Sequence, residues 1–241
     1  MPSKTFKSRL LPLVLKALPF NRRAFDILRH EFAALRARSL SVIIPSRIAA
    51  LRSVRCQSSL KVNLGAGGQS PKGWVEVDVR RHGRNSIPWD IRNGLPFASG
   101  SVSKFYLSHV LEHVDFYGDA PRLLSECRRC LEPKGIIRIV VPDAAKFIKA
   151  YLDDNLEGWR ALGFEALPDD MPTRMCILNH VFSQKGEHLF AYDFETLEYL
   201  LASVGFSRIE LSGYRLSSIF DKELDLSCHK AYSLYVDASI E

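Results

Sequence analysis

The spacing of hydrophobic residues changes near residue 60. Before it, starting at Asn21, which is suited to cap a helix, apolar side chains recur every three or four positions. These are Phe25, Leu28, Phe32 and Leu35. Because an α-helix brings such positions to one face, residues 21–38 are predicted to form an amphipathic helix with arginines over most of its other surface. Residues 45–59 are interpreted as a linker.

After residue 60, short apolar runs alternate with helical patterns. Strands are predicted where the pattern has period two or is continuously apolar: residues 61–64, 74–79, 105–108, 136–141, 207–211 and 231–236. Helices are predicted over residues 119–131, with Pro121 in the first turn, and over residues 194–204, which Gly205 closes. This alternation is typical of an α/β fold with a doubly wound, mostly parallel sheet.

The composition is that of a globular protein. The chain has 241 residues, of which 46% are hydrophobic and 25% charged, which excludes disordered, collagen-like and disulfide-dense classes. Its longest apolar runs are shorter than the roughly 18 residues of a membrane-spanning helix. We divide the chain into a helical extension with linker (residues 1–58) and an α/β domain (residues 59–241).

The charge is distributed unevenly. Residues 1–55 contain twelve Lys and Arg and two acidic residues, a net charge of +10, so the remainder carries −4 of the total +6. A basic arm on an acidic body indicates an acidic partner, either an anionic membrane surface or nucleic acid. The arm's aromatic residues have the spacing of packing residues rather than of a base-stacking platform, which disfavours nucleic acid.

The cysteines indicate a reducing compartment. There are five, an odd and scattered set. Cys127 and Cys130 form a Cys-x-x-Cys pair, but Cys127 shares a helix face with leucines, so we interpret the pair as core packing. Residues 4–20 loosely resemble a signal peptide, but Lys16 and Pro19 interrupt the apolar run. We therefore predict an uncleaved, cytoplasmic protein.

A glycine-rich turn, Gly65-Ala66-Gly67-Gly68, follows the first predicted strand of the domain. It lacks the Lys-Ser/Thr of a phosphate-binding loop, and Ser70 stands where a dinucleotide fingerprint has its third glycine. Asp78 ends the second strand, where a carboxylate can accept two hydrogen bonds from a ribose diol, and Glu76 is the alternative. A nucleoside ligand without phosphates, such as S-adenosylmethionine (SAM), suits these features.

The ordered motifs resemble a known family. They lie at residues 62–68, 73–78, 89–91, 95–97, 108–114, 131–136 and 141–143. In this order and spacing they resemble class I SAM-dependent methyltransferases of the type-11 group. More narrowly, they resemble a bacterial, polysaccharide-associated branch with a shortened first helix. The likeness spans about residues 60–236.

This resemblance implies a seven-stranded Rossmann-like methyltransferase fold with SAM as the cofactor. It also implies that the cofactor contacts lie at the carboxyl ends of the first four strands. These contacts are Gly65, Ala66 and Gly67 with the methionine part, Asp78 with the ribose, Asp90 and Ile91 with the adenine, Ser108 near the reactive methyl group, and His113 beside the pocket.

Methyl transfer to oxygen benefits from a general base. The candidates are His109, next to the fourth strand, and His180 and His188 in residues 166–192. That segment is polar and lacks periodicity, so we interpret it as a lid over the acceptor. His180 and His188 also suit a bracing role within the loop.

His109, Glu112 and His113 match the inverted zinc-protease motif His-x-x-Glu-His. That motif needs a helix that carries both histidines, and a third ligand. Here the segment directly follows a predicted strand, and residues 116–118 end any helix. A zinc hydrolase remains a remote alternative, and no metal site is predicted.

The acceptor is predicted by exclusion. Residues 108–111 read Ser-His-Val-Leu in place of the Asn/Asp-Pro-Pro-Tyr/Phe motif of amino-DNA and glutamine methyltransferases, and the chain contains no Pro-Cys nucleophile of the enzymes that methylate base C5. This leaves a small-molecule or saccharide acceptor, methylated on oxygen, with peripheral contact at the inner face of an anionic membrane through residues 1–55. The alternatives are an RNA methyltransferase and a SAM-binding protein without catalysis, each using the basic arm.

Overall fold

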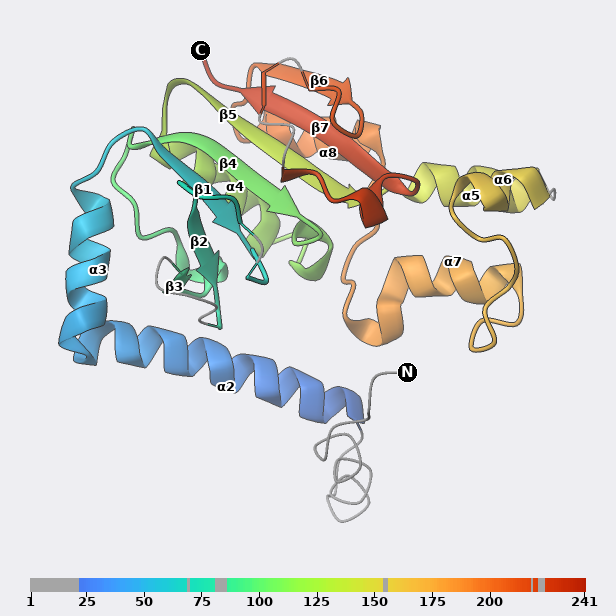
Figure 1. Ribbon diagram of the computed structural model, residues 1–241, viewed down its shortest axis with the longest axis horizontal. Coiled ribbons are helices and arrows are strands. Elements are labelled where there is room, and N and C mark those ends of the chain that lie inside the picture. Colours follow the sequence, from blue (N-terminus) through green and yellow to red (C-terminus); the bar gives the residue numbers. More distant parts are fainter. Residues whose placement is uncertain (1–21, 69, 81–85, 154–155, 218, 221–223) are drawn as a thin grey trace.

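The computed structural model describes residues 22–68, 70–80, 86–153, 156–217, 219–220 and 224–241. Its centre is a seven-stranded sheet in the order β3-β2-β1-β4-β5-β7-β6 (Figure 1). The strands are β1 (Leu60–Leu64), β2 (Val75–Asp78), β3 (Ser86–Pro88), β4 (Val102–Ser108), β5 (Leu131–Pro142), β6 (Arg208–Ser212) and β7 (Ser233–Ser239). The first five are parallel, and β7 runs antiparallel to both β5 and β6. The predicted mostly parallel, Rossmann-like sheet is confirmed.

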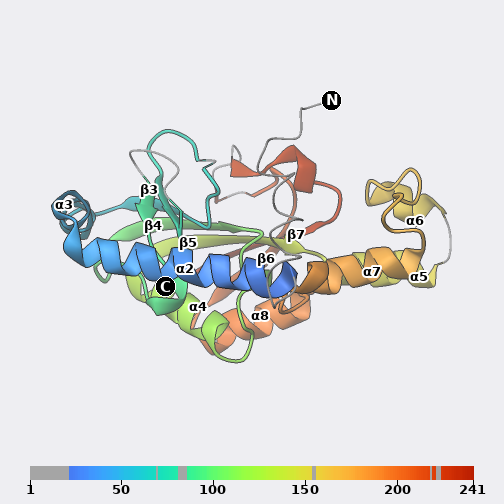
Figure 2. The same cartoon turned by 90° about the horizontal axis from the view of Figure 1, so that it is seen from below.

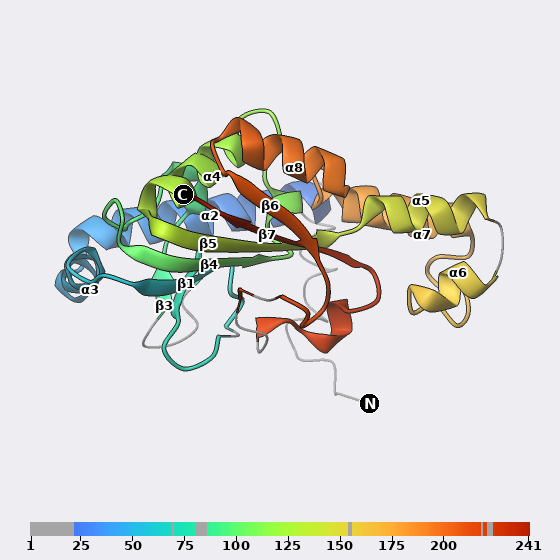
Figure 3. The same ribbon diagram turned by 90° about the horizontal axis from the view of Figure 1, so that it is seen from above.

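Seven helices surround the sheet in the described part of the chain. They are α2 (Arg22–Ile43), α3 (Pro45–Arg55), α4 (Asp119–Cys130), α5 (Ala144–Leu152), α6 (Leu156–Ala161), α7 (Arg174–Ser183) and α8 (Phe194–Ser203). Helices α4 and α8 cover one face of the sheet (Figure 3). Helices α5, α6 and α7 pack together beyond the carboxyl ends of the central strands, around Phe147, Trp159 and Ile177 (Figure 1).

The main core lies between the sheet and helices α4 and α8. Fully buried side chains such as Phe105, Ile137 and Leu124 form it, and burying each stabilises the fold by about 1.5–3 kcal/mol. The opposite face is covered by the segment that follows β6, whose Phe220 and Leu224 pack against aromatic residues of the sheet. An irregular segment therefore covers this face of the sheet, whereas helices cover the other face.

The connection from β1 to β2 is unusually short. Residues 65–74 cross between these two parallel strands, and their described part (65–68 and 70–74) contains no helix. Pro71 and Gly73 account for this, since both are poor residues for a helix interior. The predicted absence of a full first helix is confirmed for this described part.

The prediction of a linker over residues 45–59 is wrong. Residues 45–55 form α3, with Pro45 in its first turn, where the missing N–H costs nothing. Val54 is buried in the main core and Leu51 packs against it, so tertiary contacts stabilise a helix that has a weak local signal. Likewise, the segment 166–192 is not irregular throughout, because it contains α7, which Thr173 caps.

Helix α2 runs along the β3 edge of the sheet (Figure 2). It contacts the body through a narrow face of small residues, Ala34, Ala37 and Ser41, which are buried. The Ser41 hydroxyl lies 3.4 Å from the Pro88 carbonyl oxygen. The bulky apolar residues identified in the sequence point elsewhere, and Phe32 is 69% exposed.

The cysteine pair is structural, as predicted. Cys127 and Cys130 are both fully buried. Burial raises the pKa of the Cys127 thiol well above its usual range and that of Cys130 to about 11. Both thiols are therefore protonated at neutral pH and poor nucleophiles.

We expect Ellman's reagent to label the exposed Cys56 and Cys228 in the folded protein, and Cys127 and Cys130 only after unfolding in denaturant. The Cys56→Ser variant should lose one fast-reacting thiol and serves to assign the signal. Labelling of Cys127 or Cys130 at the rate of Cys228 would contradict their structural role.

Candidate functional site

The glycine turn after β1 lies against the end of β2. The Gly65 N–H donates to the Val77 carbonyl at 2.7 Å, and the Gly67 N–H donates to the Asp78 carboxylate at 3.2 Å. The Arg80 N–H holds the other carboxylate oxygen of Asp78 at 2.9 Å. The structure therefore brings together the predicted turn and the predicted ribose-binding carboxylate.

The turn requires glycine for two different reasons. Gly65 has φ +67°, and a Cβ there would lie 2.4 Å from Cγ2 of Val110, too close for any side chain. Gly67 has φ +55°, and its Cβ position has no atom within 4 Å. The backbone at Gly67 is thus open to a ligand, at the sheet edge where such folds bind theirs.

Asp90 follows β3 and is 7% exposed. Its two oxygens accept four hydrogen bonds, three from Arg92 and one from the Asn93 side chain. Burial acts to raise the pKa of Asp90, but the hydrogen bonds from Arg92 outweigh it and lower the pKa. Arg92 in turn pairs with Glu31 of α2 at 2.7 Å. The assignment of Asp90 to the adenine amine, with Ile91 beside the ring, stays a prediction.

Ser108 ends β4, on the other side of β1 from β2. Its hydroxyl oxygen is buried and has no hydrogen-bond partner. A polar atom orphaned in this way costs free energy unless a ligand or water satisfies it. His109 follows with φ +54°, and its N–H donates to the Val140 carbonyl of β5.

His109 lies in a cluster of polar side chains. Its Nδ1 is 3.1 Å from Glu112 and its Nε2 is 3.0 Å from the Ser233 hydroxyl. The His229 ring lies against the His109 ring in a tilted contact, with a centroid separation of 3.9 Å. Burial, followed by repulsion from His109, lowers the pKa of His229 to about 4, so His229 is neutral at pH 7.

The three other histidines predicted for the site, His113, His180 and His188, do not all lie together. His113 and His188 have their rings in T-shaped contact at 4.9 Å, whereas His180 lies in the last turn of α7 and is not part of this contact. Residues 111–113 form a single 3₁₀ turn, η2 (Leu111–His113). His109 therefore does not share an α-helix with His113, as the zinc-protease motif needs.

The comparison with protein families now adds to this geometry. Residues 74–139, which run from the residue before β2 into β5, match the family model described as a methyltransferase domain. The chain carries a methyltransferase domain over these residues.

Solved structures similar to this enzyme include SAM-dependent methyltransferases from three organisms. The protein from Thermotoga maritima is 14% identical, with 80% of this chain and 89% of that chain covered, at a TM-score of 0.46. The protein from Archaeoglobus fulgidus is 14% identical, with 89% of this chain and 99% of that chain covered, at a TM-score of 0.46. The protein from Mesorhizobium loti is 16% identical, with 80% of this chain and 96% of that chain covered, at a TM-score of 0.46. No curated protein matches the chain in sequence.

The residues at the carboxyl edge fit SAM chemically. A side-chain-free backbone at Gly67, an acceptor-only carboxylate at Asp78 and an unpartnered hydroxyl at Ser108 suit its amino acid, ribose diol and methyl-bearing end, respectively. When bound, SAM supplies an electrophilic methyl group. The protein's residues contribute by orienting the donor toward the acceptor.

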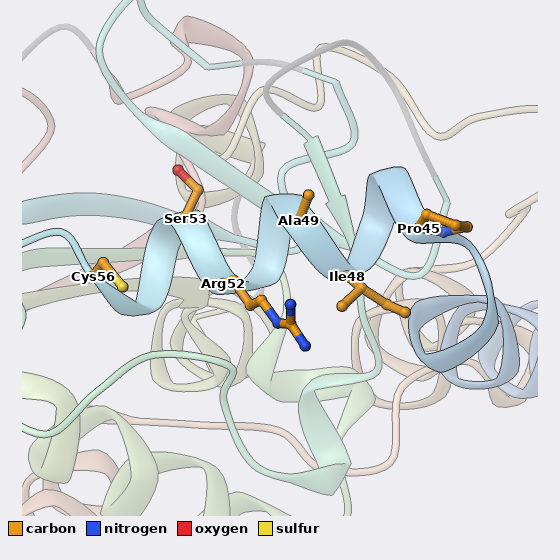
Figure 4. Close-up of a pocket in the computed structure, with 6 residues that line it drawn as sticks. All are labelled: Pro45, Ile48, Ala49, Arg52, Ser53 and Cys56. Carbon is orange, nitrogen blue, oxygen red and sulfur yellow. The ribbon is translucent and has the colours of Figure 1, made fainter.

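Two hollows are found among the residues that the structure describes. One of about 360 Å³ lies between α2, η1 (Ile91–Asn93) and α4, and Asp90 and Arg92 line it. The other, about 550 Å³, is lined by five residues of α3, among them Ile48 and Arg52, and by Cys56, which follows the helix (Figure 4). None of the predicted cofactor contacts lines the hollow on α3.

Several residues of this region were not predicted. Arg92 occupies the Asp90 carboxylate and also donates to Glu31, which lies 61 residues away in the sequence. His229 joins His109 from a segment 120 positions later in the sequence. Glu31 and His229 lie in no local sequence motif, so only their spatial contacts identify them.

Proposed function

We propose that the enzyme transfers the methyl group of SAM to an oxygen of a small molecule or saccharide, of the kind used in surface-polysaccharide synthesis. The observation that carries this proposal is the sequence Ser108-His109 at the end of β4, in place of the proline-rich motif of amino-DNA and glutamine methyltransferases. An oxygen acceptor must lose a proton, and an imidazole stands at this place.

His109 is proposed as the group that takes this proton. It directly follows Ser108, and the nearby Glu112 carboxylate stabilises the imidazolium that forms. Gly65, Ala66, Gly67 and Asp78 hold the donor, and Ser108 contacts the methyl-bearing end. His180 remains a further candidate on α7.

The test is a methylation screen with deuterated SAM and the full-length protein. Nucleotide sugars, glycolipids, simple phenols and RNA serve as acceptors, and mass spectrometry detects the gain of one labelled methyl. Label on a saccharide oxygen supports the proposal. Label confined to RNA, or to nitrogen, contradicts it. SAM binding by calorimetry without label on any acceptor would favour a binding protein.

We also propose that α2 docks on an anionic membrane surface. No helix in the described part of the chain is long and apolar enough to span a bilayer. However, one side of α2 exposes a bulky apolar stripe, comprising Ile27, Leu28, Phe32, Leu35, Val42 and Ile43. Arg29 and Arg36 border this stripe on the helical wheel and are exposed. An apolar face with arginines at its border is typical of helices that lie in the membrane interface.

We expect the double variant Leu28→Ser, Phe32→Ser to bind vesicles containing phosphatidylglycerol at least about tenfold more weakly than the wild type, because two apolar anchors are lost. Sedimentation with the vesicles measures this. The matched control is Tyr199→Ser, which removes an equally exposed ring from α8. Equal vesicle binding by all three proteins, or preferential binding of RNA across a salt titration, would contradict membrane docking.

A further inference from the structure

Three side chains with metal-ligating atoms meet where η2 contacts the segment before α8. They are Glu112, His113 and His188, and one ligating atom from each lies within 4.8 Å of the other two. The backbone holds the two segments together, since the Leu189 N–H donates to the Glu112 carbonyl at 2.7 Å. The contact therefore belongs to the fold and does not depend on long side chains alone.

Both histidines present a free Nε2. Nδ1 of His113 lies 2.9 Å from the Glu187 carbonyl oxygen, and Nδ1 of His188 lies 2.6 Å from the Val181 carbonyl oxygen. A carbonyl oxygen only accepts, so each Nδ1 carries the proton and each Nε2 keeps its lone pair. Metal-binding histidines are oriented in this way by backbone carbonyls.

The Glu112 carboxylate gives a second indication of a bound cation, independent of the two histidines. It is 1% exposed, and neither of its carboxylate oxygens has a hydrogen-bond partner. His109 Nδ1 lies 3.1 Å from one oxygen but outside hydrogen-bond geometry. A buried carboxylate without donors is costly, and a coordinated cation removes that cost.

We propose that Glu112, His113 and His188 bind a divalent transition-metal ion, with Zn²⁺ as the first candidate. Two imidazole nitrogens and one carboxylate oxygen are a known zinc donor set that leaves a position for water or another oxygen ligand. With bonds of about 2.0–2.2 Å, donor atoms in a tetrahedral site lie about 3.4 Å apart. The three donor atoms lie within 4.8 Å of one another, so the widest separation must close by up to about 1.4 Å when an ion binds.

This site differs from the motif considered in the sequence. There His109 and His113 were the paired ligands, whereas the structure places His188 in the group and leaves His109 beside the Ser233 hydroxyl. His188 is thereby assigned to metal binding rather than to proton transfer. No residue of the glycine turn contributes to the site, but Glu112 also lies 3.1 Å from Nδ1 of His109, so a bound ion would lie next to the proposed base.

The test is metal binding by the full-length protein after removal of metal with a chelator. Calorimetry with Zn²⁺ and visible absorption with Co²⁺ give affinity, stoichiometry and geometry. We expect one ion per chain in the wild type. The Glu112→Gln and His188→Ala variants should lose more affinity than the roughly 10–100-fold that loss of an outer-shell partner costs.

The matched control is His30→Ala, which removes an exposed histidine of α2 and should bind as the wild type does. SAM affinity measured on the same samples separates failure of this site from failure of the methyltransferase assignment. Circular dichroism establishes that Glu112→Gln, a nearly isosteric change, is folded. Wild-type binding no tighter than that of His188→Ala, or an unchanged Co²⁺ spectrum in Glu112→Gln, would overturn the proposal.

Discussion

The Asp78→Ala variant is expected to bind SAM at least about 100-fold more weakly than the wild type. Hydrogen bonds to a charged group contribute about 1.5–3 kcal/mol each, and a ribose diol makes two of them. The substitution also removes the acceptor for the Gly67 and Arg80 N–H groups, which loosens the turn that faces the ligand. Both effects act in the same direction.

Calorimetric titration with SAM measures this loss, and two variants make the result specific. The Asp78→Asn variant keeps the shape of the side chain but lacks its charge, so its affinity for SAM should lie between those of the Asp78→Ala variant and the wild type. Glu157→Gln removes an exposed carboxylate of α6 and should leave SAM binding unchanged. If Asp78→Ala binds as the control does while Glu76→Ala loses affinity, the ribose contact belongs to Glu76.

The Arg138→Met variant is expected to lower the free energy of unfolding by about 3–5 kcal/mol. Arg138 lies on β5, is 1% exposed, and pairs with Asp225 at 2.7 Å and with Asp237 at 2.6 Å. It also donates to the Gly213 carbonyl. Its loss leaves two buried carboxylates without their cation and releases the segment that covers the second face of the sheet.

Urea denaturation followed by circular dichroism measures this change. Arg208→Met is the matched control, because Arg208 also lies on a strand and pairs with a carboxylate, Glu210, but is exposed. Exposed pairs contribute about 0–1 kcal/mol, so the control should remain near the wild type. Similar losses in both variants would show that the buried network is not what holds the segment to the sheet.

Local patterns determined much of this fold from the sequence alone. The apolar runs of β1 and β4 and the helices α4 and α8 were predicted within a few residues, because side-chain periodicity acts between near neighbours, whereas β5 begins five residues before its predicted start. The three-residue β3 was missed, since a run so short has no periodicity. The turn at Gly65 and the position of Asp78 follow from the same local signals.

The tertiary structure decided which of these features meet. Helix α2 docks through Ala34, Ala37 and Ser41, because close approach to the body needs small side chains, and its bulky apolar face is left exposed. Asp90 is occupied by Arg92, and His188 reaches Glu112 across 76 positions in the sequence. Such contacts depend on how distant segments close on one another, which no local spacing encodes. The sequence alone therefore determined most strands, the helices α4 and α8, and the glycine turn beside Asp78. The closure of distant segments decided the histidine cluster and the orientation of α2.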